Sequence, residues 1–216
     1  MKTIILFVVC CLTWASLPAI AGGESKKVPR VSVGLRGGWS YRVGNILEEE
    51  EEILENLLSG YNVNADAYYH LNRFLAVGID YTFSRATNPD ANPVLGVYST
   101  GIHNACPSVV FTLHSRDRNN AFVATLCPVG YAGYVEKSVT DGVNVLIKGG
   151  NVETSTSVGY DLGLSRHVML SARVAFHSAN LKKMTAKSKY GKTTIDLGDD
   201  RLDFSMLQLS IGLRFR

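Results

Sequence analysis

The sequence has 216 residues, with 22 Lys and Arg against 19 Asp and Glu and a formal net charge of +3. This length fits one domain with a leader, and the near balance of charge excludes a strongly basic nucleic-acid-binding protein. After the leader, no segment approaches the run of ~20 apolar residues that a membrane-spanning helix needs.

The first predicted element is a secretory signal peptide over residues 1–21. Lys2 gives it a positive start, an apolar stretch runs from Ile4 to Leu17, and Ala19-Ile20-Ala21 provides a small-residue cleavage site. We expect a short arm over residues 22–30, on the periplasmic side, and one folded domain over residues 31–216. Cleavage leaves two cysteines, Cys106 and Cys127, in an oxidising compartment.

From Val31 onward, apolar and polar residues alternate with the period of two that is typical of β-strands. Two prolines, Pro107 and Pro128, lie inside the fourth and fifth predicted strands. Each is expected to mark a bulge, because proline cannot donate to the strand ladder. The pattern predicts eight strands, over residues 31–42, 61–71, 75–84, 97–113, 121–137, 152–164, 168–177 and 207–215.

The predicted connections alternate between short and long. Short turns are expected at residues 72–73, 116–120 and 165–167, and long loops at residues 44–60, 85–95, 138–150 and 179–201. Membrane β-barrels show this alternation, with short periplasmic turns and longer external loops. The sequence therefore predicts an all-β fold, a closed antiparallel eight-stranded transmembrane β-barrel with periplasmic N- and C-termini and four longer extracellular loops.

The polar face of the predicted strands is rich in Gly, Ser and Asn and carries few charges. Small polar residues suit the narrow interior of an eight-stranded barrel better than a solvated surface, where Lys and Glu would dominate. Aromatic residues lie near both ends of the strands, as in the interfacial girdles of membrane barrels. The alternative is a soluble, lipocalin-like secreted β-barrel, whose apolar face points inward.

With strands and loops assigned, the chain resembles the small outer-membrane β-barrel domains of the OmpA/OmpX-like "porin family". The resemblance rests on the leader, the repeated alternation, the stretch Pro107–Tyr134 and the terminal run Leu207–Phe215. The terminal run is similar to the last-strand signal by which the barrel-assembly machinery recognises its substrates. Family members usually end on the aromatic residue, whereas Arg216 follows Phe215 here.

The resemblance implies a monomer in the outer membrane of a Gram-negative cell envelope, in contact with outer-membrane lipid and lipopolysaccharide and without a cofactor. Because this fold carries many functions, the fold alone does not identify one. We expect a non-enzymatic protein with a structural, adhesion or ligand-presenting role, with an extracellular ligand that the sequence does not identify.

Seven charged residues fall on the polar face and are expected to form a network inside the barrel. Charges in so narrow an interior must pair, and a paired network plugs the barrel. The alternative is a gated polar channel. The predicted network consists of Arg36, Asp66, Asp80, Asp161, Arg173, Arg214 and Glu153.

Cys106 and Cys127 are candidates for a cross-strand disulfide. If Phe111 pairs with Phe122 across the intervening turn, Cys106 lies opposite Cys127 on the inward face. A register slip at the prolines would leave two free thiols instead.

Five lysines lie in the last predicted loop and are candidates for contact with lipopolysaccharide phosphates or an external ligand. The alternative is an ordinary solvated loop. The five are Lys182, Lys183, Lys187, Lys189 and Lys192. Residues 46–58, in the first loop, have the apolar spacing of a short amphipathic helix.

The enzymatic alternative is a lipid A-modifying barrel of the deacylase type. His177-Ser178-Ala179-Asn180 faintly resembles the His-x-Ser-Asn site of such enzymes. Here Ser178 directly follows His177, and adjacent strand residues face opposite sides, so this pair is not expected to act together. The five histidines are scattered without the spacing of metal ligands, so no metal site is predicted.

Overall fold

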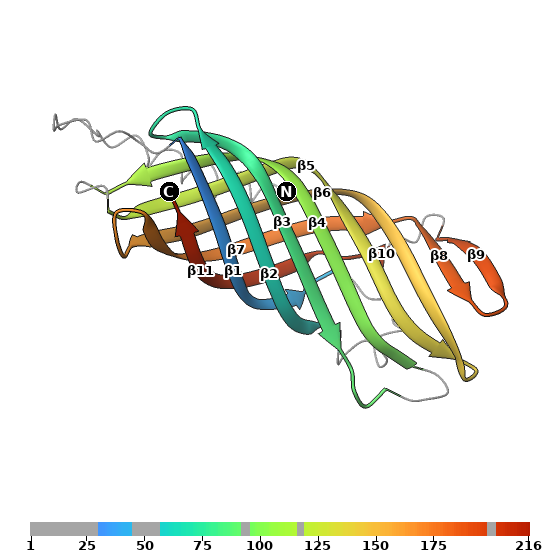
Figure 1. Cartoon of the computed structure of the whole chain (residues 1–216). Helices are drawn as coiled ribbons and strands as arrows, with labels where there is room; N and C mark the ends of the chain where they lie inside the picture. The colour runs from blue at the N-terminus through green and yellow to red at the C-terminus, as the bar shows by residue number, and fades with distance from the viewer. Residues whose placement is uncertain (1–29, 45–56, 92–95, 116–118, 198–201) are drawn as a thin grey trace.

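The structure is a computed structural model, and it describes residues 30–44, 57–91, 96–115, 119–197 and 202–216. Three short strands, β8 (Lys183–Ser188), β9 (Gly191–Asp196) and β10 (Leu202–Asp203), precede the last strand (Figure 1). No helix in these ranges is long and apolar enough to cross a membrane. The long strands are β1 (Val31–Arg42), β2 (Ser59–His70), β3 (Leu75–Thr87), β4 (Gly96–His114), β5 (Ala121–Thr140), β6 (Val143–Gly163), β7 (Val168–Leu181) and β11 (Met206–Phe215).

These eight long strands form a closed antiparallel ring. Strands β1 to β7 pair in chain order, and β11 closes the ring by pairing with both β7 and β1. A path through directly opposed residues, once around the ring from Val31, returns to β1 at Tyr41, ten residues further along. In an eight-stranded ring, this stagger tilts the strands by about 40° from the axis. The predicted all-β, antiparallel arrangement of eight strands is confirmed.

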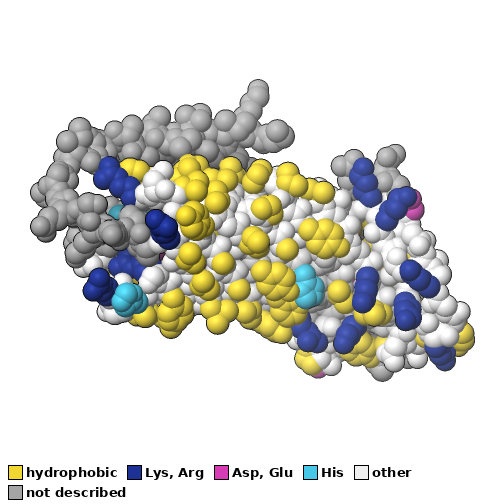
Figure 2. All heavy atoms as spheres, turned by 45° about the horizontal axis from the view of Figure 1, so that its top comes forward, with side chains coloured by type: hydrophobic (Ala, Val, Ile, Leu, Met, Phe, Trp, Pro, Cys, Tyr) yellow, Lys and Arg dark blue, Asp and Glu magenta, His cyan; other side chains and the backbone are white. Residues whose placement is uncertain are grey.

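Over the middle of the ring, most apolar side chains point outward and the polar ones point inward. Leu35 is 59% exposed and Ile79 is 61% exposed, whereas Asn62 and Gln208 are each 1% exposed. A soluble barrel has the reverse distribution, with its apolar side chains inside. On the face shown in Figure 2, hydrophobic side chains spread across the middle, and Lys and Arg gather toward both ends.

One end of the ring, here called the turn end, contains the short connections between strands. The first residue of β1, Val31, and the last residue of β11, Phe215, also lie at this end, on neighbouring strands. The turn after β2 is closed by Asn72, whose side-chain oxygen accepts hydrogen bonds from the backbone of Phe74 and Leu75. Ser165 does the same for His167 and Val168 after β6. Asx and Ser turns of this kind explain why the four residues between the strands suffice to reverse the chain.

The opposite end, here called the open end, differs from the sequence prediction. Residues 138–150 are not a loop: β5 and β6 continue as a hairpin that ends in a turn at Asp141 and Gly142. Both turn residues have positive φ, 52° and 70°, which is the backbone of a tight hairpin turn. The sequence signal for this turn is the Asp141-Gly142 pair, which is typical of a two-residue hairpin turn.

The predicted loop 179–201 is also largely strand. β7 continues to Leu181, and β8 then pairs with the far end of β6 and, on its other side, with β9. Together the outer ends of β5 and β6 and the strands β8 and β9 form a sheet that projects from the open end, here called the extension (Figure 1). The predicted helix over residues 46–58 lies almost wholly outside the described residues.

Both prolines lie at breaks in the strand register, as predicted. The β4–β5 register shifts between Ala105 and Val109, and the β5–β6 register shifts between Cys127 and Gly130. The predicted pairing of Phe111 with Phe122 is wrong, because Phe111 lies opposite Ala124. The closing pair beside the turn is His114 with Ala121, which moves the register by two residues.

Candidate functional site: the ring interior

The interior near the turn end is packed with apolar side chains. Tyr68 is 2% exposed and lies in a cluster with Ala76, Val110, Ala121 and Val123. Ala76, Ala121 and Val123 lie within the first three residues of their strands, so the cluster closes the ring just inside the short turns.

Above this cluster, five of the predicted charged residues form one chain of ion pairs. Asp66 accepts from two guanidinium groups, at 2.5 Å from Arg36 and 2.9 Å from Arg214. Arg214 also lies 3.2 Å from Asp161, which lies 3.2 Å from Arg173. All five side chains are at most 5% exposed. Buried charges are tolerated only when they are paired in this way.

Gly34 makes room for this network. A Cβ atom at Gly34 would lie 2.6 Å from an Asp66 carboxylate oxygen and 2.9 Å from an Arg36 guanidinium nitrogen. Gly34 faces inward on β1 directly opposite Asp66 on β2. Any larger residue there would displace the ion pair at the centre of the ring.

Asp80 joins the network indirectly. The Tyr68 hydroxyl donates to the Asp80 carboxylate at 2.5 Å, and the Arg214 guanidinium lies 4.8 Å from the centre of the Tyr68 ring. Arg214 is the central cation, because it contacts both Asp66 and Asp161. Tyr68 was missed because a tyrosine on the polar face gives no sequence signal of its role.

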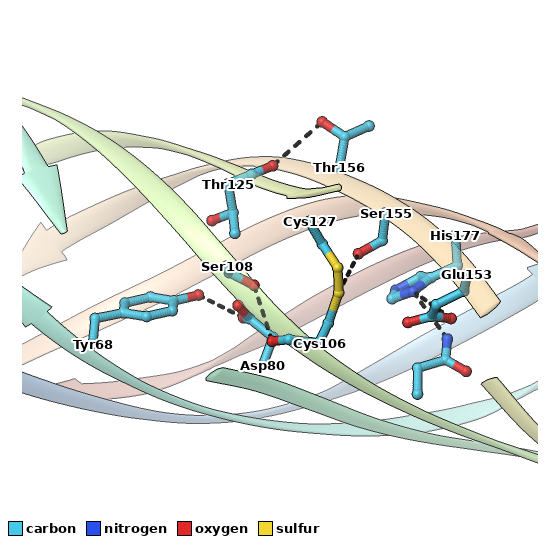
Figure 3. Close-up of a disulfide and its surroundings, with 11 residues drawn as sticks. Tyr68, Asp80, Cys106, Ser108, Thr125, Cys127, Glu153, Ser155, Thr156 and His177 are labelled. Carbon is cyan, nitrogen blue, oxygen red and sulfur yellow. Dashed lines mark hydrogen bonds and ion pairs between the residues drawn. A yellow bond between two sulfur atoms is a disulfide. The ribbon is translucent and has the colours of Figure 1, made fainter. Parts of the chain in front are cut away.

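Glu153, the seventh predicted member, lies apart from the arginines. Its carboxylate is fully buried, and the only ion pair recorded for it within the described residues is with His177, at 3.8 Å. The His177 ring also contacts the Asn104 side chain at 2.9 Å, from the opposite wall of the ring. Figure 3 shows Glu153 and His177 beside the two cysteines.

A disulfide joins Cys106 on β4 to Cys127 on β5, with the two Cα atoms 6.0 Å apart. Both cysteines lie in the stretch where the β4–β5 register shifts, beside the two prolines. The bulge brings the cysteines together even though the register near the turn differs from the predicted one. The Ser155 hydroxyl contacts the Cys106 sulfur at 3.9 Å (Figure 3).

The open end of the ring contains an apolar plug that the sequence analysis missed. Phe204, between β10 and β11, is 3% exposed and stacks on Tyr134 with ring centres 4.4 Å apart. Arg42 holds the segment by donating two hydrogen bonds to the Asp203 carbonyl and lying 4.6 Å above the Phe204 ring. The plug consists of Ile102, Tyr134, Leu181, Leu202, Phe204 and Met206.

Little space remains beside the plug. The cavity between Arg42, Tyr134 and Phe204 has room, about 20 Å³, for only one or two water molecules. The plug could not be predicted because Leu202 and Phe204 follow a segment with no strand pattern. Only the closed ring shows that these two side chains enter the interior.

The residues of the enzymatic alternative point in different directions. His177 is buried in the ring interior, and Ser178 occupies the next position of β7, whose side chain faces the opposite side. Ser155 lies directly opposite His177, but its recorded contact is with the Cys106 sulfur. Within the described residues, no group of three or more His, Cys, Asp or Glu side chains could hold a metal ion.

The predicted lysines lie on or beside the extension and are exposed. Lys183 forms an exposed ion pair with Asp196 at 3.0 Å, and Lys187 and Lys192 lie directly opposite each other on β8 and β9. Lys182 occupies the bend between β7 and β8, and Lys189 lies over the ring of its neighbour Tyr190. The structure therefore divides the five lysines into three on strands and two on connections.

No family model matches the sequence, and no curated protein matches it. The structure is similar to solved outer-membrane proteins. A major outer membrane protein from Thermus thermophilus gives a TM-score of 0.57 at 11% identity, covering 86% of this chain and 98% of that one.

Two further solved structures share the fold. The outer membrane protein OprG from Pseudomonas aeruginosa gives a TM-score of 0.55 at 10% identity, covering 85% and 94% of the two chains. Neisserial surface protein A gives a TM-score of 0.52 at 14% identity, covering 87% of this chain and 97% of that one. The expected resemblance to small outer-membrane β-barrel proteins is confirmed at the level of the fold.

Proposed function

We propose that this protein is an integral outer-membrane β-barrel with a plugged interior, and that its role is structural or surface-presenting rather than enzymatic. The observation that carries the proposal is the combination of an apolar outer face with a charged, tightly paired interior. In water, that arrangement would expose the hydrophobic side chains and bury the ionic ones, so the stable surroundings for this ring are lipid.

The apolar band has the height of a membrane. On β6, the outward side chains from Leu162 to Val152 are uncharged over ten residue steps. At about 3.3 Å per residue and a tilt of about 40°, this distance spans about 25 Å along the axis. An outer-membrane barrel needs an apolar band of about this height.

Aromatic side chains edge the band near the open end. Trp39 stacks on Tyr41 with ring centres 5.6 Å apart, and Tyr61 contacts Phe83 at 6.3 Å. Trp and Tyr favour the interface between lipid and water, because the aromatic ring is apolar and the Trp N–H or Tyr O–H group is polar. This belt supports a membrane boundary just below the extension.

The orientation follows from the two ends. Short turns and both strand termini mark the periplasmic side of such barrels, and longer connections mark the external side. We therefore place the turn end in the periplasm, after cleavage of the signal peptide over residues 1–21, and the extension outside the cell. The exposed Phe215, followed by Arg216, would then present the last strand to the assembly machinery.

Two layers inside the ring argue against a solute pathway. The ion-pair chain crosses the ring near the turn end, and the apolar plug fills it near the open end. A gated channel would have to break both layers, which differ in chemistry. The extension, by contrast, offers an exposed surface outside the membrane for adhesion or ligand contact.

The non-enzymatic part of the proposal is supported by the surroundings of His177. The imidazole is enclosed by Glu153 and Asn104 inside the ring, away from any lipid-facing position. Comparing lipid A acyl chains from cells with and without the protein tests this part. A lost or added acyl chain that depends on the protein would establish the lipid A-modifying alternative.

The membrane proposal is tested by folding the mature chain with and without detergent or lipid vesicles. We expect a folded, unboiled gel band of altered mobility only when micelles or vesicles are present. The folded protein should show no stable conductance in planar bilayers, because the interior is filled. A monodisperse, folded protein in plain buffer would contradict the proposal.

A further inference from the structure

Five lysines share one face of the extension, and one of them, Lys183, is paired with Asp196. The opposed residues across its four strands run Lys137, Leu146, Lys187 and Lys192, so three cations lie in a single cross-strand row. Lys148 lies two positions from Leu146 on the same face of β6. We call Lys137, Lys148, Lys187 and Lys192 the lysine row; all four are exposed.

This face continues the lipid-facing side of the ring. On β5, Lys137 lies on the same face of the strand as the exposed Tyr131. On β6, Lys148 lies on the same face as the exposed Val152. The opposite face of the extension packs toward the plug, since Met184 and Leu197 contact the plug residues. In Figure 2, Lys and Arg gather beyond the hydrophobic band on the same side of the molecule.

The lysine row lies at the height of lipid headgroups. Lys148 precedes Val152 by four residues on β6, and it lies about 10 Å further toward the open end along the axis at a tilt of about 40°. Between Lys148 and the turn end, the described outward positions of the ring strands carry no Asp, Glu or Lys. The outward Arg85 lies in the same cross-strand row as Lys148. The positive charge therefore begins where the apolar band ends.

Few carboxylates accompany the lysine row on the strands that the structure describes. On the described strands of this face, the one carboxylate is Asp196, and it lies 3.0 Å from Lys183. The Glu136 side chain accepts a hydrogen bond from Tyr134 on the plug side. Lys187 and Lys192 are directly opposed, and like charges in that position destabilise a sheet unless an anion lies between them.

We propose that the lysine row binds the phosphate groups of lipopolysaccharide, at the lipid A headgroup in the outer leaflet. The inference rests on the proposed function, because it requires the apolar band to be in the membrane. The phosphates of lipid A lie at the boundary between acyl chains and sugar, where the row lies. This site adds Lys137 and Lys148 to the lysines expected from the sequence. It leaves out Lys182 and Lys189, which lie on connections, and Lys183, which is paired with Asp196.

The test uses the full mature chain folded in detergent micelles and two probes, lipid A with both phosphates and the same lipid A with its phosphates removed. Binding is measured by native mass spectrometry over a lipid titration. We expect the phosphorylated probe to bind at least about tenfold more tightly, equivalent to ~1.4 kcal/mol. The preference should weaken as salt is raised, because exposed charges are screened.

A matched pair of variants separates the row from general positive charge. Lys187→Gln/Lys192→Gln should remove most of the preference for phosphate, whereas Lys182→Gln/Lys189→Gln removes the same charge and should leave the preference within about twofold. Lys137→Gln/Lys148→Gln should act as the first pair does. Equal effects of the two matched pairs would overturn the site.

Other outcomes are equally distinct. If soluble sulfated polysaccharide binds through the four lysines and lipid A does not, the partner is an extracellular glycan and the proposal is wrong. If the protein folds in micelles but binds both lipid A probes equally, the inference fails while the proposed function stands. If the protein folds without micelles, the proposed function itself fails.

Discussion

Asp66 binds two arginines and is the residue on which the interior network most depends. Asp66→Asn should lower the free energy of unfolding by about 3–5 kcal/mol, because Arg36 and Arg214 would remain buried without their carboxylate. Urea unfolding of the protein folded in lipid vesicles measures the change. Adding Arg36→Met should recover part of the loss, since one unpaired cation is removed.

The control for Asp66 is the exposed carboxylate Asp196. Its pair with Lys183 has side chains 55% and 70% exposed, so Asp196→Asn should cost less than about 1 kcal/mol. A similar cost for the two variants would mean that the ion-pair chain does not stabilise the ring.

Gly34 tests whether the network fills the interior as tightly as the distances indicate. Gly34→Ala should destabilise the folded protein by about 1–3 kcal/mol, because the new methyl group overlaps the Asp66–Arg36 pair. Gly37→Ala on the same strand is the control, as its nearest atom would be 3.8 Å away, and should change stability by less than about 0.5 kcal/mol. The same unfolding assay compares them; equal effects would exclude tight packing around Gly34.

Among the elements, β4 and β5 are linked by a disulfide at the point where the register between them shifts. The Cys106–Cys127 disulfide, with a sequence separation of 21, bridges the bulge and limits the freedom of the unfolded chain. Replacing both cysteines with alanine should cost about 3 kcal/mol. Mass spectrometry after alkylation provides the direct check: the native protein should take up label only after reduction, and labelling before reduction would show that the bridge is absent.

The extension shows how an element can be misjudged when its pattern is weak. Residues 143–150 do not alternate cleanly, because Val145, Leu146 and Ile147 are consecutive apolar residues and Gly149 and Gly150 follow. Pairing with β5 and β8 makes this segment a strand nonetheless. Tertiary pairing therefore carried the strand through Gly149 and Gly150, although Val143, Val145 and Ile147 before them do favour a strand.

For the whole molecule, the proposed function depends on whether the outer face of the ring contacts lipid or water. Ile79 is 61% exposed near the middle of the apolar band, so Ile79→Arg should cost about 2–4 kcal/mol for the protein folded in lipid vesicles. Thr193→Arg, on the exposed β9, should change stability by less than about 0.5 kcal/mol. If Ile79→Arg were neutral or improved behaviour in buffer, the outer face would be meeting water.

The alternation of residues determined much of this fold without any structure. Because successive side chains of a strand face opposite sides, the sequence alone showed which residues share a face, and the small polar residues showed which face is inside. The positions of Arg36, Asp66, Asp161, Arg173 and Arg214 on that inner face followed from the same rule, as did the bulges at Pro107 and Pro128.

Which of these residues meet was decided only by the tertiary structure. Contacts across the ring depend on its stagger and on the register of every strand pair, and neither is a local property of the chain. That is why Glu153 lies with His177 and not with the arginines, why Phe204 enters the open end, and why Lys137 and Lys148 join lysines from a distant segment. The period of a strand is set by its own backbone, whereas a neighbour across the ring is set by all eight strands together.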